Sequence, residues 1–230
     1  MHVVVNAATS VDGKLSSRER RQVAISGRED FDRVDAVRAD SGAVMVGVGT
    51  VLADDPSLTV KAEDRVAARE ADGDAAQPAR VVVDSRARTP PDAAVVDDRA
   101  ETYVLATDAA PGDRCARLTT DTTEVVVVDA DEDGRVDLPG GLAALESRGV
   151  DSVMAEGGGE LVFSLFDAGL VDELTVYVGS LVVGGRDAPT LADGDGFTDP
   201  EFVDLALRDV SRVDDGVLLA YDVADARKDA

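Results

Sequence analysis

Residue types that build many catalytic centres are scarce in this chain of 230 residues, which has one cysteine, one histidine and no tryptophan. The single cysteine, Cys115, excludes an internal disulfide and any zinc site built from several cysteines. The single histidine, His2, excludes metalloproteases that carry two histidines on one helix. Its position before the first predicted strand also argues against a Ser-His-Asp triad. The sequence therefore predicts no metal site.

Long apolar runs are also missing. The unbroken runs are short, as at residues 125–128, and none approaches the ~18 apolar residues of a membrane span. The first residues show no basic segment followed by a long apolar one, so we expect no signal peptide and no membrane partner. A chain with a single cysteine fits the reducing cytoplasm, where we expect it to act.

Positive charge is scarce as well. The chain has 23 Lys+Arg against 47 Asp+Glu, a formal net charge of −24, and only three of its basic residues are lysines. This balance argues against a nucleic-acid partner, which requires a basic surface. It also destabilises a fold by self-repulsion unless salt screens it, so we predict a halophilic protein. The alternative is an ordinary acidic protein from a GC-rich genome, which also favours Asp and Arg over Lys.

Short β-branched runs alternate with helical stretches along the chain, which predicts an α/β fold with a mainly parallel central sheet flanked by helices. The last strands lack an intervening helix and are expected to be antiparallel at one edge. Strands are predicted at residues 3–5, 43–48, 80–83, 102–106, 124–128, 151–155, 173–178 and 216–221, and helices at 26–39, 142–147 and 160–168. We expect a single domain over residues 1–224, with a mobile surface insertion at 63–78 and a frayed tail at 225–230.

A run of three glycines follows the strand predicted at residues 151–155. Gly157, Gly158 and Gly159 lead into a helix that begins near Glu160 and Leu161. Backbone without side chains lets N–H groups approach an anion at the start of a helix, which favours a phosphate or cofactor site. The alternative is a tight turn in which glycine relieves crowding.

Glu156, just before these glycines, would repel a phosphate and is expected to face sugar hydroxyls. The alternative role for this carboxylate is a favourable charge near the start of the helix.

Polar groups follow two other predicted strands, at the sheet edge where α/β proteins bind ligands. Val83, Asp84, Ser85 and Arg86 end the strand at 80–83, and an arginine there can hold the 2′-phosphate that distinguishes NADP from NAD. Thr50 and Asp54 follow the strand at 43–48 and offer a hydroxyl and a carboxylate. The alternatives are a charged surface loop in the first case and a capped turn in the second.

Three further residues are candidates for substrate binding. Asp12 and Lys14 flank a glycine just beyond the first strand, where a plain Asp-Gly turn is the alternative. Arg38 lies near the end of the first helix, where it could hold a substrate phosphate or favour the helix C-terminus. The chain lacks a nucleophile elbow and a Walker lysine loop, so chemistry by a bound cofactor is favoured.

These segments together resemble the riboflavin-biosynthesis reductase family, most closely its archaeal members, and are similar to the reductase half of the bacterial bifunctional deaminase-reductase. The resemblance covers about residues 3–222. It is carried by NAATSVDGK at 6–14, VGVGTVLADDPSLTV at 46–60, VVDS at 82–85, EGGG at 156–159 and GLVDEL at 169–174. Ala24 departs from the pattern, because the bacterial proteins have tryptophan there.

The resemblance implies a dihydrofolate-reductase-like fold, a homodimer, and NADPH, or NADH, as hydride donor to a small-molecule substrate. The hydride would reach C1′ of the ribosylamino group of a pyrimidinone ribosyl phosphate once the sugar opens to an imine. The residues implied to face the cofactor are Ala8, Thr50, Asp54, Ser85 and residues 158–164. Those implied to face the substrate are Arg38, Leu58, Lys61 and Glu156. Asp54 and Glu156 are candidate proton donors to the imine, and water is another.

Two other functions stay open. One is a reductase of the same fold on another substrate such as dihydrofolate, although the missing tryptophan and the Asp12-Gly13-Lys14 pattern argue against an apolar pterin slot. The other is a non-catalytic protein that binds a nucleotide or a sugar phosphate.

Overall fold

The computed structural model describes residues 1–198 and 202–224, and the tail predicted to fray at 225–230 lies outside the described residues. The chain divides into two compact units. The first is made of Met1 and residues 35–154, and the second of residues 2–34 together with the part that follows residue 154. Each unit is therefore built from segments that are distant in the sequence.

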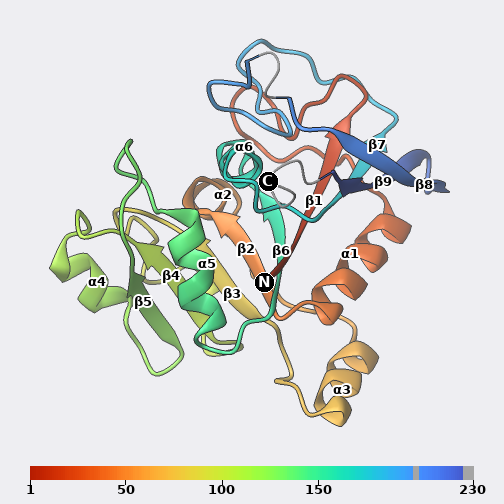
Figure 1. Cartoon of the computed structure of the whole chain (residues 1–230). Coiled ribbons are helices and arrows are strands. Elements are labelled where there is room, and N and C mark those ends of the chain that lie inside the picture. The colour runs from red at the N-terminus through yellow and green to blue at the C-terminus, as the bar shows by residue number, and fades with distance from the viewer. Residues whose placement is uncertain (199–201, 225–230) are drawn as a thin grey trace. The chain divides into compact units, whose positions relative to one another are not determined.

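Parallel strands with buried side chains form the centre of the first unit (Figure 1). They are β2 (Ala43–Gly47), β3 (Ala79–Val83), β4 (Thr102–Ala106) and β5 (Thr123–Val127), in the order β5-β4-β3-β2. Val44, Val82 and Val104 are fully buried in the core of this unit. A strand covered on both faces needs such an unbroken apolar run, which is why the sequence predicted β2, β3 and β4 closely.

Helices connect these strands. They are α2 (Val48–Asp54), α3 (Glu63–Asp72), α4 (Gly112–Leu118) and α5 (Leu138–Glu146), and a short 3-10 helix η1 spans Ala94–Val96. The sequence predicts no helix at residues 49–56, but α2 occupies most of them.

The stretch at 63–78, predicted to be a mobile insertion, contains helix α3. Arg69 of α3 is buried and donates to the carbonyl oxygen of Ser41 at 3.2 Å and that of Ala75 at 2.9 Å. Arg69 is the only buried residue of α3 and therefore anchors this helix.

The second unit combines parallel and antiparallel pairing. Its strands are β1 (His2–Ser10), β7 (Glu173–Gly179), β8 (Leu205–Val213) and β9 (Gly216–Val223), in the order β1-β7-β9-β8. β1 and β7 are parallel, whereas β7 with β9 and β9 with β8 are antiparallel. This confirms the predicted mainly parallel sheet with antiparallel strands near the C-terminus.

Three elements complete the chain. Helix α1 (Arg28–Asp40) and strand β6 (Ser152–Gly157) each pass from one unit to the other, and helix α6 (Gly159–Asp167) follows β6. Within the described part of the chain, no helix is both long and apolar enough to cross a membrane.

Candidate active site

In the first unit, the end of β2 leads into α2 and its two predicted site residues. The apolar strand ends at Gly47, after which Thr50 lies half-buried in the first turns of α2. Asp54 is the last residue of α2; its side chain is exposed, but desolvation by neighbouring atoms raises the pKa of its carboxyl above the ordinary value. A raised pKa keeps the acid form to higher pH, which suits a proton donor.

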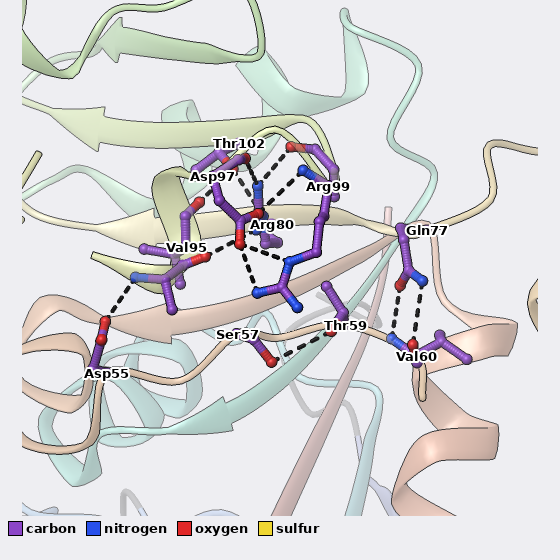
Figure 2. Close-up of polar contacts among 12 residues, drawn as sticks. Asp55, Ser57, Thr59, Val60, Gln77, Arg80, Val95, Asp97, Arg99 and Thr102 are labelled. Carbon is purple, nitrogen blue, oxygen red and sulfur yellow. Dashed lines mark hydrogen bonds and ion pairs between the residues drawn. The ribbon is translucent and has the colours of Figure 1, made fainter. Parts of the chain in front are cut away.

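The segment after α2 places three polar side chains together, two of which, Ser57 and Thr59, are seen in Figure 2. The hydroxyl oxygens of Ser57 and Thr59 lie 3.3 Å apart, and Nζ of Lys61 donates to each at 2.6 Å. Between them Leu58 has φ +50°, a left-handed conformation that costs a bulky residue energy, and its side chain is buried in the core. The buried side chain compensates for that strained backbone and holds the segment in place.

Arg38 and Lys61 meet at this segment. Nη1 of Arg38 donates to the carbonyl oxygen of Thr59 at 3.2 Å. Burial lowers the pKa of Lys61, and the positive charges of Arg99 and Arg38 lower it further. The two substrate candidates of this unit are thus close enough for their charges to act on one ligand.

Asp35 fixes the backbone beneath Lys61. Its carboxylate accepts hydrogen bonds from the N–H groups of Lys61 at 2.6 Å and Ala62 at 3.1 Å. It also pairs with Arg65 at 3.1 Å. Burial alone would raise the pKa of Asp35, but these hydrogen bonds and the charge of Arg65 lower it.

The end of β3 carries four predicted cofactor residues. The side chains of two of them form hydrogen bonds with other residues of the first unit. The Asp84 carboxylate is fully buried and accepts hydrogen bonds from the N–H and hydroxyl of Thr89 at 2.7 and 2.8 Å. The Ser85 hydroxyl accepts from the N–H of Val136 at 3.0 Å. Val83 is half-buried and Arg86 is exposed. The Asp84 side chain therefore shapes this loop, and Arg86 is the residue here whose charge is open to solvent.

In the second unit, the turn after β1 makes contacts that hold loops. Asp12 accepts hydrogen bonds from Ser10 at 2.6 Å and from the N–H groups of Val183 and Gly184 at 3.0 and 2.7 Å. The bond from Ser10 and then those from the backbone lower the pKa of Asp12 to about 2. Nζ of Lys14 donates to the carbonyl oxygen of Ala188 at 3.2 Å. These contacts give both residues structural roles, and their predicted substrate contact stays a prediction.

The connection from β6 to α6 is the glycine-rich segment. Glu156 and Gly157 end the strand, Gly158 has φ +96°, and Gly159 is buried at the first turn of the helix. A Cβ on Gly159 would lie 2.6 Å from the carbonyl oxygen of Thr190. Glycine is therefore required at 158 by backbone conformation and at 159 by packing.

The remaining predicted cofactor residues of this unit differ in exposure. Ala8 is half-buried on β1, Glu160 is exposed in the first turn of α6, and the Leu161 side chain is buried. A ligand at this helix start would therefore meet backbone N–H groups. The N–H groups of the first turn have no hydrogen-bond partner within the helix. This donor set fits the phosphate groups of a nucleotide cofactor.

Sequence reasoning missed two loops beside these residues. Residues 188–193 pack on α6, where the Asp193 carboxylate accepts from the N–H and hydroxyl of Thr190 at 3.0 and 2.6 Å. The loop after η1 brings Arg99 near enough to Lys61 for its charge to lower the pKa of that lysine. Neither loop has a motif; only the shortage of cations makes an arginine such as Arg99 worth testing.

In the described ranges 1–198 and 202–224, no three His, Cys, Asp or Glu residues gather so that they could hold a metal ion. The groups found instead are hydroxyls, carboxylates, cations and helix-start N–H groups. These suit the positioning of an anionic ligand.

Comparison with known proteins gives the family. The chain is 46% identical over 196 residues to the 2,5-diamino-6-ribosylamino-4(3H)-pyrimidinone 5′-phosphate reductase of Archaeoglobus fulgidus, which covers 85% of this chain and 88% of that protein. It is 41% identical over 223 residues to the protein of the same name from Methanothermobacter thermautotrophicus, covering 96% and 98%.

Solved structures agree on the fold. The diaminohydroxyphosphoribosylaminopyrimidine deaminase/5-amino-6-(5-phosphoribosylamino)uracil reductase of Thermotoga maritima matches with a TM-score of 0.77 at 21% identity. The match covers 97% of this chain and 56% of that one, so the chain spans little more than half of this relative. The RibD C-terminal domain profile matches residues 1–219, and the chain belongs to the RibD C-terminal domain family.

Proposed function

We propose that this protein reduces the ribosylamino group of 2,5-diamino-6-ribosylamino-4(3H)-pyrimidinone 5′-phosphate to the ribitylamino product, with NADPH as reductant, in riboflavin biosynthesis. The observation that carries the proposal is the 41% identity that runs over 98% of an archaeal reductase of that name. The predicted single domain over residues 1–224 is part of this proposal.

The chemistry assigns distinct tasks to the chain. NADPH, when bound, supplies a hydride to C1′ of the open-chain imine. A proton must reach the imine nitrogen to complete the amine, and Asp54, with its raised pKa, is our first candidate donor. Glu156, half-buried at the end of β6, is the second.

Cofactor binding is proposed at the strand ends and at the start of α6. Gly157, Gly158 and Gly159 have no side chains that would keep a pyrophosphate from the N–H groups at the start of α6, and the Asp193 carboxylate lies beside Gly159. The full proposed set is Ala8, Thr50, Asp54, Val83, Asp84, Ser85, Arg86, Gly157, Gly158, Gly159, Glu160 and Leu161. Asp84 and Leu161 would act through their backbone, because their side chains are buried.

A preference for NADPH over NADH would rest on Arg86, which is exposed at the end of β3 and can face a ribose 2′-phosphate. Arg86→Ala should raise KM for NADPH about tenfold and leave KM for NADH within about twofold, as loss of one charge-assisted contact implies. Arg117→Ala, an exposed arginine on α4, is the control. Equal effects on both cofactors would contradict the role.

Substrate binding is proposed for Asp12, Lys14, Arg38, Leu58, Lys61 and Glu156. Arg38 and Lys61 are the natural phosphate partners, since both lie at Thr59 and both are cations. Leu58 would contribute through its backbone, because its side chain is buried.

The reaction is tested by the absorbance of NADPH at 340 nm, in buffer of high potassium concentration, with the purified pyrimidinone phosphate. We expect a loss of absorbance that depends on this substrate and does not occur with dihydrofolate. A folded protein without turnover would contradict the proposal and favour a binding protein. Turnover with dihydrofolate alone would favour another reductase of this fold.

We also propose a homodimer formed through β8 and β9. β8 is an edge strand whose residues from Leu205 to Val210 are all exposed, including Leu207 at 57% and Val210 at 55%. An exposed edge strand with apolar side chains offers a second copy of the chain a strand with which to pair.

The dimer is tested by sedimentation at high salt. Leu207→Glu should shift the protein to monomer, because a carboxylate would be buried at the contact. Ala206→Glu is the matched control on the opposite face of the same exposed strand. A monomeric wild-type protein would contradict the proposal.

A further inference from the structure

A buried arginine organises the loop that follows η1. Arg80 of β3 is fully buried, and its guanidinium donates to the carbonyl oxygens of Ala94 at 3.2 Å and Ala100 at 2.7 Å. It also donates to the Thr102 hydroxyl at 2.9 Å and to the Asp97 carboxylate at 2.8 Å. A buried cation with this many partners holds the loop in one conformation.

Asp97 in turn positions the side chain of Arg99. The second oxygen of the Asp97 carboxylate accepts from Nε of Arg99 at 2.6 Å and pairs with Nη2 at 2.6 Å. Burial would raise the pKa of Asp97, but the bonds from Arg99 and Arg80 hold it far below the ordinary value. Asp97 therefore stays ionised and fixes the direction of the Arg99 guanidinium.

The guanidinium of Arg99 is turned toward Ser57 and Thr59 (Figure 2). Asp97 takes the edge formed by Nε and Nη2, which leaves the Nη1 side for another acceptor. Half of the Arg99 side chain is exposed, so a ligand can reach it.

Three positively charged side chains lie at or near the segment that follows α2. Lys61 donates to the hydroxyls of Ser57 and Thr59, Arg38 donates to the Thr59 carbonyl, and Arg99 is near enough to lower the pKa of Lys61. Asp97 is a single carboxylate shared by two guanidinium groups, and the charge of Asp98 acts on both of them as well. Arg38 and Arg99 nevertheless repel the charge of Lys61, and an anion placed among these three cations would relieve that repulsion.

We propose that Arg99, positioned by Asp97 and Arg80, is a third cation of the substrate site at Arg38 and Lys61 and makes that site selective for the phosphorylated substrate over its dephosphorylated form. The inference rests on the proposed function of this site. A dianionic phosphate can take charge-assisted hydrogen bonds from all three cations, whereas a hydroxyl offers little charge to attract them.

The kinetic test compares two substrates, the pyrimidinone phosphate and its dephosphorylated form. Arg99→Gln should raise KM for the phosphate about tenfold with kcat within about twofold, and leave KM for the dephosphorylated form nearly unchanged, as loss of one charged contact implies. Arg99→Lys should restore part of the affinity. Arg148→Gln removes an arginine similarly paired with Glu124 on the surface and should change neither value.

A second test needs no turnover. The chain has three lysines, so amine labelling of Lys61 is read separately from Lys14 and Lys228 by mass spectrometry. Inorganic phosphate should slow labelling of Lys61 in the wild type, and in Arg99→Gln the same protection should need about tenfold more phosphate.

The outcomes separate the two proposals. Equal protection in wild type and Arg99→Gln, or equal KM changes for both substrates, would overturn the role of Arg99 even if the reaction is confirmed. Protection that depends on Arg99 in a protein without turnover would support the anion site and contradict only the proposed reaction.

Discussion

At the scale of single residues, the glycines at the start of α6 meet two structural requirements, one of backbone conformation and one of packing. Gly158 has φ +96°, and Gly159 lies against residues 190–193. Both constraints remove side chains from the start of a helix, where N–H groups are open to an anion. The sequence indicated the turn, but the packing reason depends on a loop some 30 residues further along.

Gly159→Ala tests this packing. Its Cβ would lie 2.6 Å from the Thr190 carbonyl, so the loop must shift, which should lower the free energy of unfolding by about 1–3 kcal/mol. Affinity for NADPH should fall as well. Urea unfolding followed by circular dichroism measures the first effect, and a titration with NADPH the second.

The matched control is Gly112→Ala. Gly112 is the first residue of α4, as Gly159 is of α6, but a Cβ there meets open space. Its replacement should change the free energy of unfolding by less than about 1 kcal/mol, in the stabilising direction. An equally small effect at Gly159 would contradict the packing argument.

At the scale of elements, the valine-rich runs predicted β2, β3 and β4 well because strands buried on both faces need them. Helix α3 was missed because its one buried side chain, Arg69, donates to Ser41, which lies in the distant connection between α1 and β2. β8 was missed because a bulge between Leu207 and Asp209 interrupts its alternation. Long-range partners such as these leave no local pattern.

The start of α1 shows the same limit. The N–H groups of Glu29 and Asp30 donate to the Asp214 carboxylate at 3.1 and 3.0 Å. In return, the Glu29 carboxylate accepts from the N–H of Asp214 at 3.0 Å. This reciprocal cap joins residues 185 positions apart, and a sequence pattern reports only neighbours.

For the candidate site residues, too, the sequence predicted the position in the chain better than the contacts of the side chain. Arg38 and Lys61 were singled out from the sequence and do lie at one segment. Asp84 was expected to face a cofactor, but its buried carboxylate binds Thr89. Which way a side chain points after a strand depends on the loop around it.

Asp12 gives a pH prediction for the loop that it holds. Its folded pKa of about 2 lies below the ordinary 3.8, so its stabilising contribution is present above pH 3.8 and is lost as pH falls toward 2. Asp12→Asn should weaken the pH dependence of unfolding within that window. It should also speed amide exchange at Val183 and Gly184, whose N–H groups donate hydrogen bonds to the Asp12 carboxylate.

The exposed aspartate Asp92 provides the control for this change. Asp92→Asn should leave amide exchange at Val183 and Gly184 as in the wild type. Unchanged exchange in Asp12→Asn would contradict the structural role of Asp12, and a loss of substrate affinity without such a change would favour the substrate contact instead.

At the scale of the whole molecule, the net charge of −24 sets the conditions for stability. Self-repulsion is screened over about 10 Å at 0.1 M salt and about 3 Å at 1 M. We therefore propose a halophilic protein, in which the cations around Lys61 are a local exception to an acidic chain.

Thermal unfolding in KCl tests the salt requirement. The midpoint should rise by about 10 °C or more between 0.1 and 2 M KCl, because screening removes repulsion from the folded state. KCl is preferred to a sulfate salt, which strengthens apolar burial by exclusion. A midpoint that stays constant would favour an ordinary acidic protein.

The central claim is that hydride reaches C1′ of the ribosylamino group, and an isotope measurement tests it most directly. The protein is given NADPH with deuterium at both C4 positions and the pyrimidinone phosphate, and the product is analysed by mass spectrometry and NMR. We predict one deuterium per product, located at C1′ of the ribityl chain. Deuterium on the pyrimidine ring, or product without deuterium, would contradict the claim.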